Sequence, residues 1–351
     1  MITQPLHWLV LTGVPFENSG GAQRAAQISK TLLNYGHKVT YIYAIDYREK
    51  ESSNIKIPLN NFATYHIKKF NIYNFIRRIN KDKKLIVLIE VPYPTFLPIV
   101  QILKRYSFKI IYELIDPWDT ELGKHWYNKS IEYRIIKLAD ILTATAKSLQ
   151  EDLIKKSNRH VYLIPNAYNK DLFIKKNYKR PTDLPDPPIL GYTGALWGSW
   201  FDIELIIEIA KTYQNHNIVL IGEYLKQFNP FITSNIHFLG LKPQTDLPSY
   251  LAYFDIGLIP FKVNKLTERV NPLKIYEYLA MELPVVASYT PELEGIPNVY
   301  LAKNKEEFTN KIHIALKNKN DFKKVKLWLE NNNWENRVDK LINLIYIKKA
   351  R

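Results

Sequence analysis

The stretch DIGLIPFKVNKLTERVNPLKIYEYLAMELPVVAS, residues 255–288, carries the clearest structural signals in the chain. Ile256–Pro260 and Pro284–Ala287 are short apolar runs typical of buried strands, and Pro272–Met281 between them has helical spacing. Asn271 and Pro272 are a typical start signal, because asparagine caps a helix and proline costs no hydrogen bond at the first helical position. The stretch therefore predicts a strand–helix–strand unit.

The start of this helix is a candidate anion site. Its first backbone N–H groups and the positive end of its dipole favour a phosphate, and Lys274 adds a charge in the first turn. Glu277 follows one turn later and leans toward the helix start, where a carboxylate can accept hydrogen bonds from a ribose diol. The alternative is that Lys274 and Glu277 form an ordinary surface pair at i,i+3 spacing.

The same alternation of strand and helix extends in both directions from this stretch. Such alternation predicts an α/β fold with parallel sheets covered by helices. The strands that we expect are Leu6–Thr12, Val39–Ile45, Leu85–Glu90, Lys109–Leu114, Val161–Ile164, Ile189–Thr193, Ile218–Ile221 and Ile236–Phe238. The helices that we expect are Ala22–Tyr35, Ser130–Leu138, Leu149–Lys155, Asp202–Tyr213 and Leu247–Tyr253.

A polar, proline-rich segment divides this pattern into two halves. We expect an N-terminal domain over residues 1–170, a linker over 171–188 and a C-terminal domain over 189–335. Residues 336–351 form a further helix that we expect to pack back on the N-terminal domain. The predicted architecture is two Rossmann-like, doubly wound domains that face a central cleft.

The composition limits the chemistry and the location. The chain has no cysteine, which excludes disulfides, thiolate metal sites and a cysteine nucleophile. No secretory signal is visible at the N-terminus, and the most apolar stretch, Leu85–Leu103, contains Glu90 and three prolines, so we expect a cytoplasmic protein.

The formal net charge is +15, and 13 basic residues against 4 acidic ones lie between Arg48 and Lys109. This excess fits a solvated lysine-rich surface or a face that lies on anionic lipid at the inner side of the plasma membrane. The segment Phe70, Tyr73, Phe75, Ile76 and Ile79 would give an apolar helical face, for the interface or for the core. Nucleic acid is a weaker alternative, because no nucleic-acid-binding motif accompanies the charge.

Five segments in a fixed order resemble the GT-B glycosyltransferases of family 4 (group 1 type). The strongest is PLKIYEYLA with PVVAS, which resembles the subgroup whose donor-binding helix reads PLK-x-[YF]-EYLA. The others are SGGAQRAAQISKTLLNYGHKV (Ser19–Val39), LIPNAYNKDLF (Leu163–Phe173), ILGYTGALWGSWFDIELI (Ile189–Ile206) and NIHFLGLKPQTDLPSYLAYFDIGLIPF (Asn235–Phe261). Together they cover nearly the whole chain, although the glycine loop alone is a weak signal.

The resemblance implies a nucleotide diphosphate sugar, of the UDP or GDP type, as co-substrate and no other cofactor. It also implies a set of donor-binding residues, and some of them have a purely structural alternative. Gly20 and Gly21 could serve only a tight turn, and Trp197 could pack between the domains. The implied donor-binding residues are Gly20, Gly21, Gly194, Ala195, Trp197, Leu241, Arg269, Asn271, Leu273, Lys274 and Glu277.

On the acceptor side the candidates are fewer. Asp116 follows a predicted strand and is the candidate catalytic residue, with a buried helix cap as the alternative. The candidate acceptor-binding residues are Arg24, Trp118, Asp119 and Asn166. Arg24 reaches a phosphate or is simply solvated, and Asn166 bonds substrate or fixes the turn after Pro165.

One departure from the family is informative. Most members carry a glutamate eight residues before the one that matches Glu277, and here that position is Arg269. Either the adjacent Glu268 replaces the missing carboxylate, or Arg269 pairs with the diphosphate or with an acidic sugar. The catalytic role of the family's first glutamate therefore does not carry over.

The sequence predicts a metal-independent glycosyltransferase, because it has no D-x-D triplet and no histidine pair at ligand spacing. By resemblance it retains anomeric configuration and transfers a sugar to a glycan or lipid-linked acceptor in surface polysaccharide assembly. The alternatives are a sugar-nucleotide 2-epimerase of the same architecture and a degenerate relative that binds glycan or nucleic acid. Donor sugar, base, acceptor and linkage are not readable from these residues.

Overall fold

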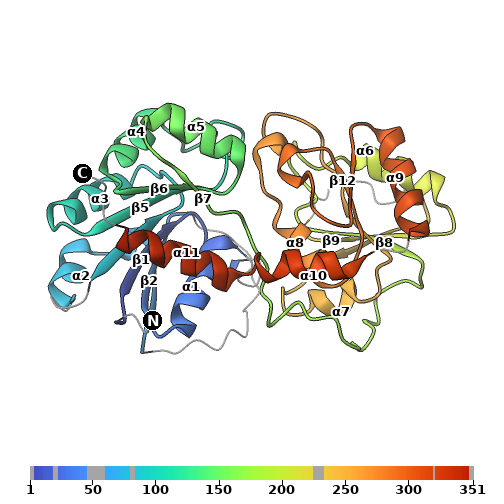
Figure 1. The fold of residues 1–351 in the computed structure, drawn as a ribbon, viewed down its shortest axis with the longest axis horizontal. Coiled ribbons are helices and arrows are strands. Elements are labelled where there is room, and N and C mark those ends of the chain that lie inside the picture. The colour runs from blue at the N-terminus through green and yellow to red at the C-terminus, as the bar shows by residue number, and fades with distance from the viewer. Residues whose placement is uncertain are drawn as a thin grey trace. The chain divides into compact units, whose positions relative to one another are not determined.

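The chain forms two compact units. The computed structural model describes residues 4–18, 23–45, 60–79, 84–223, 233–318 and 321–347. Unit 1 consists of Met1–Pro165 together with Trp334–Arg351, and unit 2 of Asn166–Asn333. Figure 1 shows a sheet with helices on both faces in each unit.

Unit 1 is built on a seven-stranded parallel sheet in the order β3-β2-β1-β4-β5-β6-β7. Parallel strands need crossover connections, and here helices supply them. The strands are β1 (His7–Thr12), β2 (Lys38–Tyr43), β3 (Phe62–His66), β4 (Leu85–Ile89), β5 (Lys109–Leu114), β6 (Ile141–Ala144) and β7 (Tyr162–Leu163). The helices are α1 (Arg24–Asn34), α2 (Ile72–Arg78), α3 (Phe96–Arg105), α4 (Lys129–Leu138), α5 (Lys147–Ser157) and α11 (Trp334–Tyr346).

The strand order reverses beside β1, which pairs with β2 on one side and with β4 on the other. At such a switch point the loops after the two strands leave toward opposite faces of the sheet and open a crevice at its carboxyl edge. Thr12 ends β1, and Glu90 directly follows β4 at this edge.

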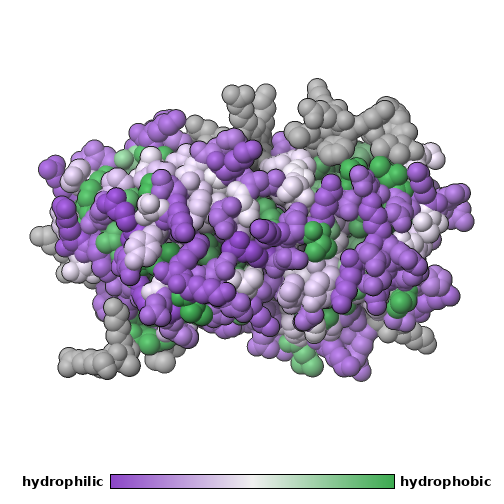
Figure 2. All heavy atoms as spheres, turned by 90° about the horizontal axis from the view of Figure 1, so that it is seen from above, coloured by the Kyte–Doolittle hydropathy of each residue, from purple (hydrophilic) through white to green (hydrophobic). Residues whose placement is uncertain are grey.

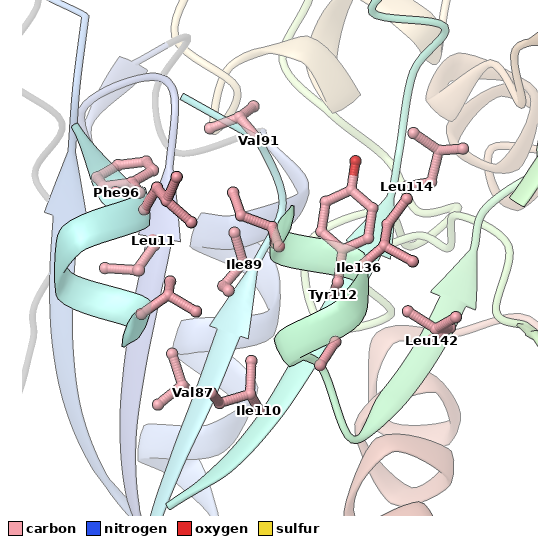
Figure 3. Packing of buried hydrophobic residues seen from close by; sticks show 14 of the residues in the cluster. Leu11, Val87, Ile89, Val91, Phe96, Ile110, Tyr112, Leu114, Ile136 and Leu142 are labelled. Carbon is pink, nitrogen blue, oxygen red and sulfur yellow. The ribbon is translucent and has the colours of Figure 1, made fainter. Parts of the chain in front are cut away.

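The core of unit 1 follows from continuous apolar strands that are covered on both faces. In β4 all five residues are buried, as expected for a central parallel strand. Figure 3 shows Val87 and Ile89 of β4 among Ile110, Tyr112 and other side chains of the neighbouring elements.

Unit 2 has a six-stranded parallel sheet in the order β10-β9-β8-β11-β12-β13, with its switch point beside β8. Its strands are β8 (Ile189–Thr193), β9 (Asn217–Ile221), β10 (Ile236–Gly240), β11 (Ile256–Ile259), β12 (Val285–Ser288) and β13 (Val299–Ala302). Its helices are α6 (Ile203–Thr212), α7 (Leu247–Leu251), α8 (Leu273–Ala280), α9 (Lys305–Lys317) and α10 (Phe322–Glu330). Short 3-10 helices are η2 (Ile67–Lys69), η3 (Thr267–Arg269) and η4 (Pro291–Leu293).

The predicted α/β class with two Rossmann-like domains is confirmed by these sheets. The division along the chain lies at Pro165, a few residues before the end that we expected at residue 170. The expected linker, residues 171–188, belongs to unit 2, because its Phe173 and Leu184 are buried in the core of that unit. The return to unit 1 lies between Asn333 and Trp334.

The last helix, α11, packs on unit 1. It lies against α1 (Figure 1), and the Arg24 guanidinium sits 5.6 Å from the centre of the Trp334 ring. The Lys109 ammonium donates to the Ile345 carbonyl at 2.6 Å, near the end of the helix. Such a cation stabilises the negative end of a helix dipole.

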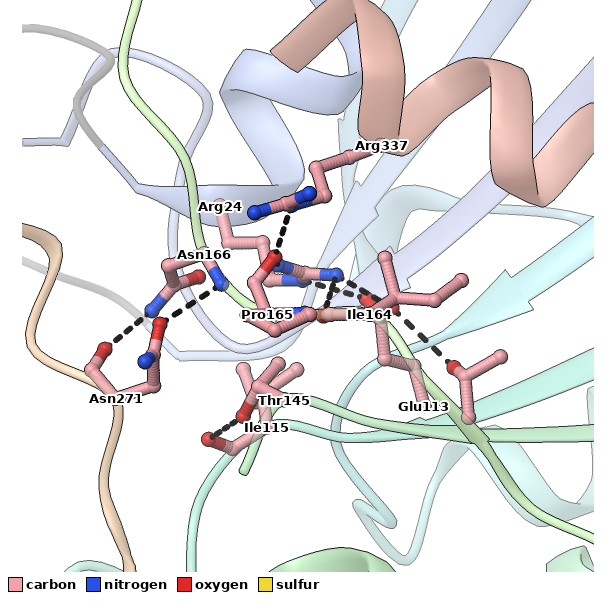
Figure 4. Close-up of polar contacts among 10 residues, drawn as sticks. Arg24, Glu113, Ile115, Thr145, Ile164, Pro165, Asn166, Asn271 and Arg337 are labelled. Carbon is pink, nitrogen blue, oxygen red and sulfur yellow. Dashed lines mark hydrogen bonds and ion pairs between the residues drawn. The ribbon is translucent and has the colours of Figure 1, made fainter. Parts of the chain in front are cut away.

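A buried ion pair joins α1, β5 and the end of unit 1's first segment (Figure 4). Arg24 donates Nε and Nη2 to the two oxygens of Glu113 at 2.8 and 2.7 Å. Its other contacts are with the carbonyls of Ile164 and Pro165 at 2.9 and 3.0 Å. Arg337 of α11 donates to the same Pro165 carbonyl at 2.9 Å. The pair therefore holds distant segments of unit 1 together.

Arg24→Ala should lower the free energy of unfolding by about 3–5 kcal/mol, because it leaves the buried Glu113 carboxylate without its countercharge. The matched control is Lys104→Ala, which removes the ion pair with Asp140, whose partners are 36% and 20% exposed. That change should cost about 1 kcal/mol or less. Urea unfolding measures both, and a loss for Arg24→Ala no larger than for Lys104→Ala would contradict a structural role.

Candidate functional site

The start of α8 is the centre of the candidate site in unit 2. Pro272 occupies the N-cap position and Leu273 is the first helical residue, and no side chain caps this end. The prediction that Asn271 is the N-cap is therefore wrong by one residue. The Asn271 side chain has another use, because its Oδ1 accepts hydrogen bonds from the Asn166 N–H and the Tyr276 hydroxyl, both at 2.9 Å.

Asn166 is tied to the same residue twice. Its side-chain Nδ2 donates to the Asn271 carbonyl at 2.7 Å, in addition to the backbone contact (Figure 4). The two asparagines connect the first residue of unit 2 to the residue before the α8 cap. Of the two roles expected for Asn166, these contacts match the fixing of the turn after Pro165.

Lys274 lies in the first turn of α8 against aromatic rings and bare backbone. Its Nζ is 5.3 Å from the ring centre of Tyr192 and 5.7 Å from that of Phe261, within the range of cation–π attraction. Among the described residues no carboxylate forms an ion pair with it. Burial lowers its pKa, and the charge of Glu277 opposes this change. A partly buried cation without an ion-pair partner among the described residues is a natural place for an anion to bind.

Glycines allow this close packing at the ends of three adjacent strands. Gly194 after β8 has φ 143°, and a side chain there would lie 2.8 Å from Cε and 2.9 Å from Nζ of Lys274. Gly222 after β9 has φ 155°, and its Cβ would lie 1.8 Å from the Gly194 carbonyl oxygen. Gly240 ends β10 at φ 71° and accepts a hydrogen bond from the Gly222 N–H at 2.9 Å. Only glycine tolerates both the backbone conformation and the contacts at the first two positions.

Glu277, one turn after Lys274, is 5% exposed. It does not form the surface ion pair that was the alternative reading, because its Oε1 accepts a hydrogen bond from Gln244 Nε2 at 3.2 Å. Burial raises the pKa of Glu277 to about 7, whereas the Gln244 hydrogen bond and the charge of Lys274 act in the opposite direction. The carboxyl group is therefore poised between its two protonation states near neutral pH.

The remaining donor-side candidates of unit 2 have contacts of their own. Leu273 and Leu241 are partly exposed, and the Tyr192 hydroxyl donates to the Ala195 carbonyl at 3.1 Å. Trp197 is partly buried and donates Nε1 to Glu223 at 3.2 Å, with its ring 5.0 Å from that of Trp200. Gly20 and Gly21 lie outside the described residues.

The two residues that could replace the missing first glutamate differ in exposure. Glu268 is exposed and Arg269 is partly buried at the end of η3. Val270 follows η3 in an extended conformation, and Arg269 precedes the α8 cap by three residues in sequence. Which of Glu268 and Arg269 replaces the missing glutamate stays a prediction.

In unit 1, Asp116 and Trp118 follow β5 at the carboxyl edge of the sheet. Burial raises the pKa of Asp116 to about 7. Trp118 is 8% exposed, packs with its ring 5.2 Å from that of Trp126, and its Nε1 has no hydrogen-bond partner among the described residues. Asp119 is exposed. The segment after β5 therefore places two carboxyl groups, Asp116 and Asp119, and the Trp118 ring at the carboxyl edge of the sheet.

Arg24 is not solvated, which was one of the two alternatives for it. It is 5% exposed, and its guanidinium donates to Glu113 and to two backbone carbonyls. Its position at a helix start does not reveal this burial, because the partners lie far away in sequence. The acceptor-binding role of Arg24 stays a prediction.

Sequence reasoning missed two buried polar groups at these edges. Gln244 is 3% exposed and contacts Glu277. Glu90, 1% exposed, accepts a hydrogen bond from Thr12 at 2.8 Å across the switch point of unit 1. Burial and the neighbouring Glu113 raise the pKa of Glu90 to about 8. A glutamate at the end of an apolar strand is a usable signal for Glu90, whereas nothing in the local pattern marks Gln244.

The described ranges contain no group of three or more His, Cys, Asp or Glu side chains that could hold a metal ion. The same part of the chain contains no helix with the length and hydropathy needed to cross a membrane.

Comparison with known sequences places the family signal in unit 2. Residues 187–318 match the family model described as "Glycosyl transferases group 1". The putative teichuronic acid biosynthesis glycosyltransferase TuaH of Bacillus subtilis (strain 168) is 24% identical over 217 residues, which is 56% of this chain. The match spans about half, 54%, of the length of that protein.

Solved structures resemble the whole chain at low sequence identity. HepE of Anabaena in complex with UDP has a TM-score of 0.68 at 12% identity, over 97% of this chain and 99% of its own. The apo form of the lipopolysaccharide outer core galactosyltransferase WaaB has a TM-score of 0.65 at 13% identity, over 97% and 99%. The UDP-GlcNAc 2-epimerase of Methanocaldococcus jannaschii has a TM-score of 0.60 at 12% identity, over 97% and 100%.

These likenesses establish the fold, and the family model covers the part of unit 2 that contains α8, Lys274 and Glu277. The chain has the two-domain GT-B fold, and its second unit matches the group 1 glycosyl transferases.

Proposed function

We propose that this protein is a glycosyltransferase that uses a nucleotide diphosphate sugar, of the UDP or GDP type, as donor. The observation that supports this best is the start of α8, where the partly buried Lys274 has no ion-pair partner among the described residues and Glu277 follows one turn later. The group 1 family match over residues 187–318 contains both residues. A diphosphate would lie at the helix start and on Lys274, and a ribose would hydrogen-bond to Glu277.

In the proposed reaction the bond between the anomeric carbon and the diphosphate oxygen breaks, and a bond to the acceptor oxygen forms. The acceptor hydroxyl proton goes to the departing phosphate, which retains the anomeric configuration if the attack comes from the same face. Lys274, the free N–H groups of α8 and Arg269 would stabilise the negative charge on the leaving group. In this proposal no residue of the chain serves as a nucleophile.

In this proposal the acceptor binds to unit 1. It is a glycan or a lipid-linked glycan used in surface polysaccharide assembly. Asp116, Trp118 and Asp119 follow β5 at the carboxyl edge of that unit's sheet. An aromatic ring with an N–H and a carboxyl group are suited to a sugar, which presents an apolar face and hydroxyl groups. The printed name of the TuaH relative, which refers to teichuronic acid biosynthesis, supports this choice of acceptor class.

The decisive experiment measures nucleotide release from a panel of UDP- and GDP-sugars, with and without an acceptor extract. Release that requires the acceptor supports a transferase. Lys274→Met should lower donor affinity at least tenfold, since a charge-assisted contact contributes about 1.5–3 kcal/mol. The exposed Lys324 of α10 provides the control Lys324→Met, which should leave affinity unchanged. Equal affinities for the two variants would remove Lys274 from the site.

A sugar-nucleotide 2-epimerase is the second candidate, because a structure of that activity shares the fold over 97% of this chain. An epimerase would convert a sugar nucleotide without any acceptor and without releasing the nucleotide. Chromatography of the same reaction mixtures distinguishes the two. An epimerised sugar nucleotide in the mixture that lacks acceptor would replace the transferase proposal.

We propose that turnover needs no divalent metal. The positive charge that a metal would supply to the diphosphate comes from Lys274 and the α8 dipole in this proposal. Turnover should therefore persist in EDTA at about its rate in magnesium. Loss of turnover in the chelator, with recovery on addition of magnesium or manganese, would contradict the proposal.

We also propose that unit 1 carries a surface for anionic lipid, at the inner face of the plasma membrane. The exposed basic residues of this part of unit 1 are Lys68 and Lys69 of η2, Arg77 and Arg78 of α2, and Lys84 directly before β4. The apolar part of this segment is not available, because Phe70, Phe75, Ile76 and Ile79 pack against the core and only Tyr73 is largely exposed. Because these apolar side chains are not available, attraction to lipid would be electrostatic. The one face of the molecule drawn in Figure 2 is mostly hydrophilic, with hydrophobic residues in small patches.

Binding to anionic vesicles should therefore be strong at low salt and weak near 1 M salt, where the Debye length falls to about 3 Å. Replacement of Arg77, Arg78, Lys81, Lys83 and Lys84 by glutamine should weaken vesicle binding by about 1 kcal/mol per charge. Lys81 and Lys83 lie outside the described residues. The control changes five exposed lysines of unit 2, Lys303, Lys317, Lys323, Lys324 and Lys326. Equal losses in a sedimentation assay, or no binding by the wild type at low salt, would contradict the surface.

A further inference from the structure

Gln244 lies in the loop between β10 and α7, and its side chain is buried against α8. It is 3% exposed, and its Nε2 donates to Glu277 Oε1 at 3.2 Å. The backbone of the loop is held in place, because the Gln244 carbonyl accepts a hydrogen bond from the Leu247 N–H at 3.2 Å at the start of α7. Burial of an amide costs free energy unless its polar atoms are paired, so this contact has a defined geometry.

The neighbouring Lys242 fixes the same loop from its other side. Its ammonium forms an ion pair with Asp183 at 2.7 Å, and the Tyr250 hydroxyl of α7 donates to the same carboxylate at 2.9 Å. Gln244 thus stands between two anchored points, residues 242 and 247, and its side chain has little freedom to move away from Glu277. A residue held in this way can set the orientation of the carboxylate that it contacts.

The groups that face Glu277 are few. Lys274 is on the same helix, and Tyr278 follows Glu277 directly and is buried with its hydroxyl bonded to Thr193. Gln244 supplies the one hydrogen bond to this carboxylate that the described residues provide. It contacts Oε1, which leaves Oε2 for hydrogen-bond donors outside the chain. The amide N–H also favours the ionised carboxylate, which burial alone disfavours.

We propose that Gln244 is a positioning residue, whose amide orients the Glu277 carboxylate and favours its ionised form so that Oε2 accepts hydrogen bonds from the ribose hydroxyls of a nucleotide. The proposal rests on the proposed function for the identity of the ligand. A positioning role for Gln244 differs from a packing role in one measurable respect. A packing residue changes stability or affinity equally at every pH, whereas Gln244 acts through the protonation of one carboxyl group.

The direction of the pH effect follows from the sign of the shift. Burial raises the pKa of Glu277 to about 7 and the Gln244 hydrogen bond lowers it. Removal of that hydrogen bond therefore raises the pKa further, and the ionised fraction at about pH 7 falls. At about pH 9 the carboxyl group is ionised in both proteins, so the difference in ligand affinity disappears.

The experiment uses Gln244→Met, which keeps the length of the side chain and removes the donor. The pKa of Glu277 is measured in the ligand-free full-length protein by the carboxyl-carbon NMR signal, assigned through its loss in Glu277→Gln. We expect the titration to move upward by about one unit, which lowers UDP affinity about fivefold at pH 7 and leaves it nearly unchanged at pH 9. GDP is tested in parallel, and calorimetry measures both affinities.

The double variant Gln244→Met with Glu277→Gln is the matched control. Glu277→Gln should remove the part of the pH dependence that comes from Glu277, and the added Gln244→Met should then have little further effect at either pH, because both act through one carboxyl group. Gln244→Ser provides a second test should the methionine variant fold poorly, since it also cannot reach Glu277. Thermal unfolding confirms that each variant is folded.

Three results would overturn the proposal. An unchanged Glu277 titration in both Gln244 variants would remove the link between the two residues. An equal loss of affinity at pH 7 and pH 9 would assign Gln244 a packing role. Failure of the wild type to bind either UDP or GDP would overturn the proposed function and the identity of the ligand. In that case the titration of Glu277 would still show whether Gln244 acts on that carboxyl group.

Discussion

The candidate site depends on keeping two opposite charges, the partly buried Lys274 and the buried Glu277, apart within one turn of α8. Lys274 and Glu277 are at a spacing at which surface residues usually pair, yet Lys274 lies on Tyr192 and Phe261 while Glu277 contacts Gln244. Each charged group therefore keeps binding capacity that an ion pair would consume. The separation requires Gly194, because a side chain there would overlap the lysine. Gly222 is required in turn, because its Cβ would overlap the Gly194 carbonyl oxygen.

Much of the fold could be predicted from local pattern. Continuous apolar runs predicted β5 and β8 with their observed bounds, because central parallel strands are buried on both faces. The strand β3 was not predicted, since only one of its five residues is buried and its pattern is weak. The helix-start signal located α8 to within a residue, but it could not show that Asn271 is engaged by Asn166, more than a hundred positions away in sequence.

The site was predicted to the extent that its residues lie on one helix. Lys274 and Glu277 follow from the start signal of α8, whereas Gln244 could not be predicted, because its contact depends on how β10 and α8 pack. The burial of Arg24 could not be predicted either. A basic residue in a first helical turn resembles a phosphate ligand, and only the position of Glu113 on β5 shows that it is a buried structural residue. Roles set by contacts distant in sequence are the ones that local pattern misses.

The two charged groups of α8 also respond to a ligand in a coupled way. Burial lowers the pKa of Lys274 and raises that of Glu277, so burial disfavours both charged forms in the ligand-free unit. An anion beside Lys274 would favour the protonated amine, and hydroxyl donors at Glu277 would favour the carboxylate. A ligand that carries both an anion and a diol stabilises both charged forms at once, whereas either fragment alone stabilises one. Under the proposed function, the arrangement would therefore discriminate in favour of a molecule in which a diphosphate and a ribose are joined.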